Sequence, residues 1–221
     1  MKKVILITGG SSGIGKAIGE FLLEKGFIVY GTSRNASAIS NSKIKLVDLD
    51  VRNSDSIKAC VARVLELEGR IDVLINNAGV GITGPLEEIP LEEIKNNFET
   101  NVFGPIETMK AVLPQMRIQK SGLIINITSI AGYMGLPFRS IYLSSKGALE
   151  LISESLRMET KAFGVHITNV APGDFATDIA SRRFHAPVIK GSAYEKIYQL
   201  QLDMMNEHVS GGSNPIEMAV S

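Results

Sequence analysis

The chain has few of the features that mark a secreted, membrane or nucleic-acid-binding protein. Its 221 residues include a single cysteine, Cys60, which excludes a disulfide within the chain, and 23 basic residues balance 23 acidic ones. A surface without excess positive charge does not favour nucleic acid or an anionic membrane as a partner. No apolar run approaches the roughly 20 residues that cross a bilayer, and the one that follows Lys3 is too short for a signal peptide. We therefore expect a cytoplasmic protein without a membrane span.

Internal repeats, low-complexity tracts and linkers are also missing, so we expect a single domain over residues 1–221. The apolar fraction of 44% is ordinary for a globular protein. Cys60 lies in an amphipathic helical stretch and is expected to be a small core residue. The histidines, His166, His185 and His208, have no metal-ligand spacing around them, and we expect no metal site.

Apolar runs typical of strands alternate with helical patterns along the chain. This alternation predicts an α/β fold, a Rossmann-like doubly wound parallel β-sheet with helices on both faces. Right-handed crossovers would place the carboxyl ends of the strands along one edge, where a dinucleotide binds. The segment 84–116 is typical of one long helix that is interrupted at Gly104 and Pro105. The predicted strands are residues 4–8, 28–32, 45–48, 73–76, 123–127 and 166–170.

A glycine-rich turn follows the first of these strands. Residues 9–15 have the sequence Gly-Gly-Ser-Ser-Gly-Ile-Gly and lead into a helical pattern. Glycines let the backbone approach a pyrophosphate closely, and the new helix presents N–H groups to that anion. Ser11 and Ser12 add hydroxyls that can cap the helix or bind phosphate. The spacing Gly-x-x-x-Gly-x-Gly differs from the general dinucleotide fingerprint.

A tyrosine and a lysine, Tyr142 and Lys146, are one helical turn apart, and Ser129 lies thirteen positions before the tyrosine. On a helix, positions i and i+4 point the same way, so the phenol and the ammonium can share one pocket. A free phenol has a pKa of about 10, and a nearby cation favours its ionised form. The pair is suited to proton transfer, although Tyr-x-x-x-Lys also occurs by chance on solvated helices.

Together these motifs make the chain resemble the short-chain dehydrogenase/reductase family, in its single-domain form. A family member of this type would end in one further strand, which we expect to be missing here. The match runs from Val4 to Thr177. It comprises the cofactor turn at 8–15, the fourth-strand motif Asn-Asn-Ala-Gly at 76–79, Asn101, Ser129, Tyr142, Lys146 and the loop at 172–177.

The resemblance implies hydride transfer between a nicotinamide cofactor and a carbonyl or secondary alcohol. Tyr142 would be the general acid or base, and Lys146 would lower its pKa and bind the nicotinamide ribose. Ser129 would hold the substrate oxygen, and Asn101 would hold a water that links Lys146 to solvent. The resemblance also allows a homodimer or a homotetramer. The residues expected to contact the cofactor are Gly9, Ser11, Ser12, Gly13, Ile14, Gly15, Ser33, Arg34, Asp50, Val51, Asn77, Ala78, Gly79, Tyr142, Lys146, Pro172, Gly173, Phe175 and Thr177.

The end of the second strand predicts which cofactor is preferred. Enzymes that prefer NAD(H) usually place an acid there to bind both ribose hydroxyls, and that acid repels a 2′-phosphate. This chain has Thr32 at that point, followed by Ser33 and Arg34. A guanidinium matches the geometry of phosphate, so we expect NADP(H) to be preferred.

Two acids lie at the end of the third strand. The resemblance implies that the carboxylate of Asp50 binds the adenine ring, with the backbone amide of Val51 contributing a further contact. Asp48, two residues earlier, is expected to be structural or solvated.

The segment 175–214 is expected to be a variable lid over the substrate. Its apolar side chains can line a pocket for a lipid-like or steroid-like molecule, or can pack as helix faces on the core, and the sequence does not decide between these. Arg182 and Arg183 are expected to be a solvated pair. The apolar side chains concerned are Phe175, Ile179, Phe184, Val188, Tyr194, Tyr198, Leu202, Met204 and Met205.

Two other classes of function share this fold. An isomerase, dehydratase or epimerase with a retained cofactor usually has a different glycine spacing and a longer substrate domain. A non-catalytic protein that senses dinucleotides should have lost one of the catalytic residues, and Ser129, Tyr142, Lys146 and Asn101 are all present. The sequence therefore favours an oxidoreductase that uses a small-molecule substrate.

Overall fold

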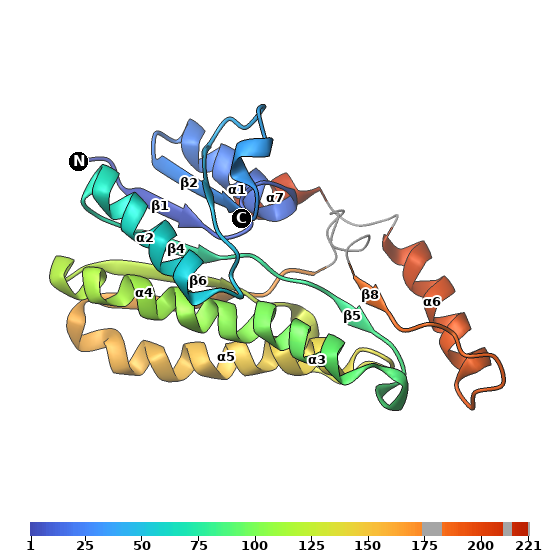
Figure 1. Cartoon of the computed structure of the whole chain (residues 1–221). Coiled ribbons are helices and arrows are strands. Elements are labelled where there is room, and N and C mark those ends of the chain that lie inside the picture. Colours follow the sequence, from blue (N-terminus) through green and yellow to red (C-terminus); the bar gives the residue numbers. More distant parts are fainter. Residues whose placement is uncertain (174–182, 210–213, 221) are drawn as a thin grey trace.

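A parallel sheet of six strands lies at the centre of the molecule (Figure 1). The computed structural model describes residues 1–173, 183–209 and 214–220. The strand order is β3-β2-β1-β4-β6-β7. The direction of strand addition reverses between β1 and β4, and such a reversal is where open α/β sheets bind their ligands. The strands are β1 Val4–Ile7, β2 Ile28–Ser33, β3 Lys45–Asp48, β4 Val73–Asn76, β6 Gly122–Ile127 and β7 Val165–Val170.

These six strands agree with the predicted segments to within one residue at each end. Their apolar runs are continuous because helices cover both faces of the sheet, so neighbouring residues of one strand are both buried. In β1, Leu6 faces one layer and Ile7 the other, and both are fully buried. The predicted α/β class with a doubly wound parallel sheet is confirmed.

Two helical layers cover the sheet (Figure 1). The larger core lies between the sheet and α2 (Ser54–Glu68), α4 (Gly104–Gln119) and α5 (Ser140–Thr160). The other face of the sheet packs on α1 (Gly13–Glu24) and α7 (Pro215–Val220).

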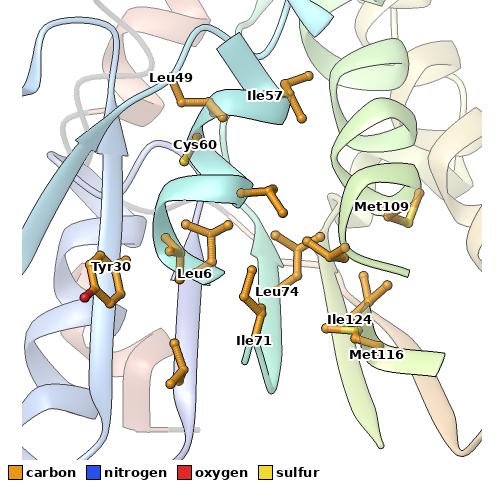
Figure 2. Packing of buried hydrophobic residues seen from close by; sticks show 14 of the residues in the cluster. Leu6, Tyr30, Leu49, Ile57, Cys60, Ile71, Leu74, Met109, Met116 and Ile124 are labelled. Atoms are coloured by element: carbon orange, nitrogen blue, oxygen red, sulfur yellow. The ribbon is translucent and has the colours of Figure 1, made fainter. Parts of the chain in front are cut away.

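Side chains from strands and helices interlock in the larger core. Figure 2 shows Leu74 and Ile124 from the strands beside Met109 and Met116 from α4, with Cys60 on α2. Burial raises the pKa of the Cys60 thiol to about 12, which makes it an inert core residue, as predicted.

The long helix is interrupted just before the predicted position at Gly104 and Pro105, by a π-helical turn. The segment consists of a 3-10 turn at Leu86–Glu88, α3 (Leu91–Phe98), a π-helical turn at Glu99–Phe103, and then α4. Pro105 has no N–H, so the α-helical hydrogen bond to the carbonyl four residues earlier, that of Asn101, cannot form. Single π-helical turns inside α-helices are frequent at functional sites.

A second, two-stranded parallel sheet was not predicted. It pairs β5 (Ile82–Thr83) with β8 (Phe184–His185), which are far apart in the sequence. Next to it, α6 (Glu195–Val209) contributes the fully buried Tyr198 to a third apolar cluster. Strands of two residues carry too little periodicity to be seen in a sequence. None of the helices in the described part of the chain is long and apolar enough to cross a bilayer.

We expect Ile124→Ala to lower the free energy of unfolding by about 2–5 kcal/mol, because it leaves a cavity beneath the central strands. Ile124 is fully buried, whereas Ile118 on α4 is 77% exposed. The matched control Ile118→Ala should therefore change stability by less than about 0.5 kcal/mol. Urea unfolding followed by circular dichroism measures both, and equal effects of the two substitutions would contradict the assignment of the core.

Candidate active site

A cleft of about 850 Å³ opens at the carboxyl ends of the central strands. It brings together most of the residues that the sequence predicted for the site. Gly15 and Asn101 do not line it, and Phe175 and Thr177 lie outside the described residues. The predicted residues that line the cleft are Gly9, Ser11, Ser12, Gly13, Ile14, Ser33, Arg34, Asp50, Val51, Asn77, Ala78, Gly79, Ser129, Tyr142, Lys146, Pro172 and Gly173.

The glycine turn is shaped by close contacts with Asn77. Gly9 and Gly13 have positive φ angles of 66° and 54°, which L side chains rarely adopt. A Cβ atom on Gly15 would collide with the Nδ2 atom of Asn77 and would lie 2.5 Å from the Gly9 carbonyl oxygen. Gly15 thus allows the turn to pack against Asn77 and has no place on the wall of the cleft.

Asn77 joins the fourth-strand motif to the glycine turn by hydrogen bonds. Its Nδ2 atom donates to the carbonyl oxygens of Thr8 and Gly9 at 2.9 and 3.2 Å. Its backbone N–H and that of Ala78 both donate to the Thr8 hydroxyl at 3.0 Å. The amide side chain is therefore used to hold the turn, a role that the sequence did not reveal.

Two guanidinium groups line the cleft together with Asp50. Arg34 is exposed after β2, and Arg52, which the sequence did not single out, also lines the cleft. Arg52 donates to both carboxylate oxygens of Asp50, at 3.2 and 3.0 Å. These hydrogen bonds are the largest cause of the lowered pKa of Asp50, and the charge of Arg34 adds to it. The carboxylate expected to bind adenine is thus already paired with a neighbour.

Neighbouring residues on β2 and β3 bear on the choice of cofactor. Thr32 is buried and accepts a hydrogen bond from the Gly9 N–H at 3.2 Å, so its hydroxyl supports the turn. Asp48 stands opposite Ser33 in the sheet and accepts the backbone N–H of Ala36 at 2.6 Å. The pairing of β2 with β3 therefore brings an acid close to the end of β2, although Asp48 does not line the cleft.

The tyrosine and lysine lie on the first two turns of α5. The Nζ atom of Lys146 lies 5.9 Å from the centroid of the Tyr142 ring and donates to the Ile127 carbonyl oxygen at 2.9 Å. Lys146 is only 5% exposed. Burial lowers the pKa of its ammonium to about 8, and the charge of Glu150 opposes this effect. A charged group in such a site can stabilise a neighbouring phenolate strongly, because little water screens it.

Ser129 begins a loop that is tied to another part of the cleft. Its hydroxyl oxygen accepts the Ala131 N–H at 3.2 Å and caps a 3-10 turn at Ile130–Tyr133. The next residue, Ile130, donates its N–H to the Pro172 carbonyl oxygen at 3.1 Å. The loop that carries Ser129 is thereby joined to the predicted cofactor loop after β7.

Asn101 supports the site from behind. Its Oδ1 atom accepts the Val80 N–H, and its Nδ2 atom donates to the Val80 carbonyl oxygen, both at 2.9 Å. The same Nδ2 atom donates at 3.1 Å to the hydroxyl of Ser145, the residue before Lys146. The side chain thus holds α5 to the segment after the fourth-strand motif. Pro105 has no N–H to donate to the backbone carbonyl of Asn101, and the water expected beside Asn101 stays a prediction.

The C-terminal apolar residues mostly pack on one another, around the buried Tyr198. Met205 is buried and lines the cleft, whereas Met204 is exposed. Phe175 and Ile179 lie outside the described residues. For the described residues other than Met204 and Met205, the structure therefore favours packing over lining a pocket. The residues that pack around Tyr198 are Phe184, Val188, Tyr194 and Leu202.

Several residues that line the cleft were missed by the sequence analysis. Arg183 is partly buried and lines the cleft, so the expectation of a solvated side chain was wrong for this residue, while Arg182 lies outside the described residues. No motif marks Arg183, because the pairing of β5 with β8 is what brings its side chain against Gly81. Among the other missed residues are Ile82, Met134, Leu136 and Arg139.

A family model described as short chain dehydrogenase matches residues 3–187. The chain belongs to this family. It is an oxidoreductase of the dehydrogenase/reductase type, and members of the family use nicotinamide cofactors.

Known relatives and a solved structure agree with this assignment. The chain is 46% identical over 181 residues to a 3-ketodihydrosphingosine reductase of Bacteroides thetaiotaomicron, in an alignment that covers 82% of this chain and 67% of the relative. It is 34% identical to human 17-beta-hydroxysteroid dehydrogenase type 1, over 99% of this chain and 72% of the relative. A structure of ElxO with NADP bound, 28% identical, matches with a TM-score of 0.79 over 99% of this chain and 89% of that one.

We expect Gly15→Ala to weaken the binding of NADPH by about tenfold or more, which corresponds to about 1.4 kcal/mol. The added Cβ atom would collide with Asn77 and the Gly9 carbonyl group and would push the turn away from its present shape. Gly135→Ala is the matched control, because a Cβ atom there meets nothing within 4 Å. Titration of cofactor fluorescence measures both variants, and unchanged affinity in Gly15→Ala would refute the role assigned to this contact.

Proposed function

We propose that the protein transfers hydride between a nicotinamide cofactor, with NADPH preferred, and a carbonyl or secondary alcohol substrate. The observation that carries this proposal is the buried Lys146 ammonium, 5.9 Å from the centroid of the Tyr142 ring at the wall of the cleft. When bound, the cofactor supplies or accepts the hydride. The residues of the chain supply the proton, the orientation of the substrate and the shape of the cleft.

Tyr142 is the general acid in reduction and the general base in oxidation. Its phenol gives the proton to the developing alkoxide, and the positive charge of Lys146 makes the phenolate that remains less costly. Ser129 donates a hydrogen bond to the same substrate oxygen and holds it beside the phenol. The support for Ser129 is its position on the cleft wall, in a loop tied to Pro172.

A water bound to the backbone carbonyl of Asn101 completes a path by which Lys146 and Tyr142 recover their proton. This part of the proposal is supported by Pro105, which leaves that carbonyl without its α-helical donor. The side chain of Asn101 keeps the carbonyl in place through its bonds to Val80 and Ser145.

The preference for NADPH is supported by the positive charge on the cleft wall after β2 and β3. Arg34 and Arg52 both line the cleft there, but Asp50 neutralises Arg52, so Arg34 is the group that offers a planar set of donors to a 2′-phosphate. Asp48 is the acid that could oppose this preference, but it bonds the backbone of Ala36 and lies off the cleft wall. The structural neighbour ElxO was solved with NADP bound, which also favours the phosphorylated cofactor.

The substrate proposed is a hydrophobic, lipid-like or steroid-like carbonyl compound. Ile82, Met134, Leu136 and Met205 line the cleft with apolar surface. Two relatives are named for 3-ketodihydrosphingosine and for a hydroxysteroid. A screen of long-chain keto compounds and ketosteroids with NADPH, followed at the nicotinamide absorbance, tests the proposal. Failure of all of them to consume NADPH would count against this substrate class.

We expect Tyr142→Phe to lower turnover by about two orders of magnitude or more, the usual contribution of general acid–base catalysis. The ring is kept, so NADPH should bind as tightly as it does to the parent protein. Turnover is measured with the best substrate of the screen, and binding by cofactor fluorescence. Near-normal turnover in this variant would remove Tyr142 from the mechanism.

We expect Arg34→Ala to weaken NADPH binding by about 1.5–3 kcal/mol, the range for hydrogen bonds to charged groups, with little effect on NADH. The control is Arg63→Ala, because Arg63 is an exposed residue on α2 that bonds only Glu66 among the described residues. Both cofactors are titrated at one fixed ionic strength. Equal affinity of the parent protein for NADPH and NADH would contradict the preference and leave the catalytic roles untouched.

A further inference from the structure

A buried acid, Glu150, lies one helical turn beyond Lys146 on the same face of α5. Glu150 is 7% exposed, although acidic residues are almost never buried without partners. Residues i and i+4 of a helix have Cβ atoms about 5–6 Å apart. The two side chains therefore leave α5 from the same face, and the carboxylate acts on the ammonium through its charge, at a distance longer than a direct ion pair. Glu150 has no role in the proton transfer proposed for Tyr142 and Lys146.

The hydrogen bonds of Glu150 leave part of its carboxylate unused. The Oε2 atom accepts from Nδ2 of Asn169 on β7. The Oε1 atom is buried, and among the described residues its hydroxyl contact is a loose one with the exposed phenol of Tyr133. Burying a carboxylate with one unsatisfied oxygen costs free energy, so it requires a compensating charge nearby.

The ammonium of Lys146 provides that charge, and because it is itself buried it also requires a negative charge nearby. The Ile127 carbonyl oxygen is its one hydrogen-bond partner among the described residues, and a carbonyl carries no net charge. Burial lowers the pKa of this ammonium, and the negative charge of Glu150 opposes that shift. The charge of Glu150 therefore favours the protonated form of Lys146.

Three other polar groups face Glu150 from the elements around it. The phenol of Tyr133, from the turn that Ser129 begins, interacts with the carboxylate, and this interaction raises the pKa of Tyr133. Glu154 is one turn further along α5 and is exposed, and Asn169 on β7 is uncharged. The contact with Tyr133 also links the carboxylate to the Ser129 loop.

We propose that Glu150 is a positioning residue whose buried carboxylate keeps the Lys146 ammonium charged beneath the proton-transfer site. The inference rests on the proposed function, in which the charge of Lys146 both binds cofactor and favours the phenolate. Because the ammonium is the protonated form, loss of the carboxylate lowers the pKa of Lys146, and the charge disappears at a lower pH. Cofactor affinity should then weaken earlier as the pH rises.

The test is NADPH titration between about pH 6 and pH 10, the range in which a lysine of lowered pKa loses its proton. In the parent protein, affinity should fall in one step as Lys146 is deprotonated. In Glu150→Gln, which keeps the shape of the side chain, the midpoint should move down by about one pH unit, the low end of the shift that a nearby opposite charge produces. Absence of any step in the parent protein would overturn the inference.

Two variants test whether the charge itself is responsible. Glu150→Asp keeps the charge and should restore most of the parent midpoint, and a midpoint as low as that of Glu150→Gln would count against the inference. Glu154→Gln is the matched control on the exposed face and should leave the midpoint unchanged. An equal shift in Glu154→Gln would show a general effect of charge on α5 and would overturn a special role for Glu150.

Two further results show whether a failed test contradicts the role of Lys146 or only that of Glu150. Lys146→Met should show no step, and a step that persists in this variant would overturn the proposed role of the lysine and this inference with it. A step present in the parent protein and unmoved in Glu150→Gln would overturn the inference about Glu150 alone. If Glu150→Gln does not fold, Glu150→Met takes its place, and failure of both to fold would show a purely structural role and would also overturn the inference.

Discussion

The contact between the ends of β1 and β4 is the constraint on which the site depends. Thr8 is buried there, and its hydroxyl accepts two backbone N–H groups, from Asn77 and Ala78. Asn77 returns two bonds to the backbone of Thr8 and Gly9. Each such bond contributes about 1 kcal/mol on average, but their greater effect is geometric. They fix the shape of the glycine turn at the point where the strand order reverses, and the rest of the cleft is arranged around that turn.

Behind the cleft, buried polar side chains also fix elements to one another by hydrogen bonds. Asn76 on β4 donates to Asn126 on β6 at 2.8 Å, and Asn126 donates to Ser153 on α5 at 2.8 Å. Together with the bonds of Asn101, they fix α5 against the sheet. A buried polar network specifies one arrangement of its elements, because a shift would leave further donors or acceptors unpaired. The depth at which Lys146 lies follows from this fixed position of α5.

The sequence predicted the central sheet and most of the cleft wall. Long apolar runs separated by helical patterns determine the six strands, and motifs at the ends of those strands meet because parallel strands end at a common edge. It missed Arg52 and Arg183, and it could not assign Asn101 and Gly15 their supporting roles. Those roles depend on which atoms meet across the fold, and residue type and spacing do not report that. The sequence also could not decide whether the apolar residues near the C-terminus pack on the core or line the substrate pocket, because both roles require the same kinds of side chain.

The sequence by itself determined the family, the class of chemistry and the order of the elements, because these depend on local patterns that the chain carries wherever it folds. The tertiary structure decided the electrostatics of the site. Lys146 and Glu150 are one turn apart on α5, but their burial depends on how closely α5 packs on the sheet, and desolvation is a property of that packing. It also decided that Asp50 is paired with Arg52. Charges act through distance and solvent exposure, and both exist only once the chain has folded.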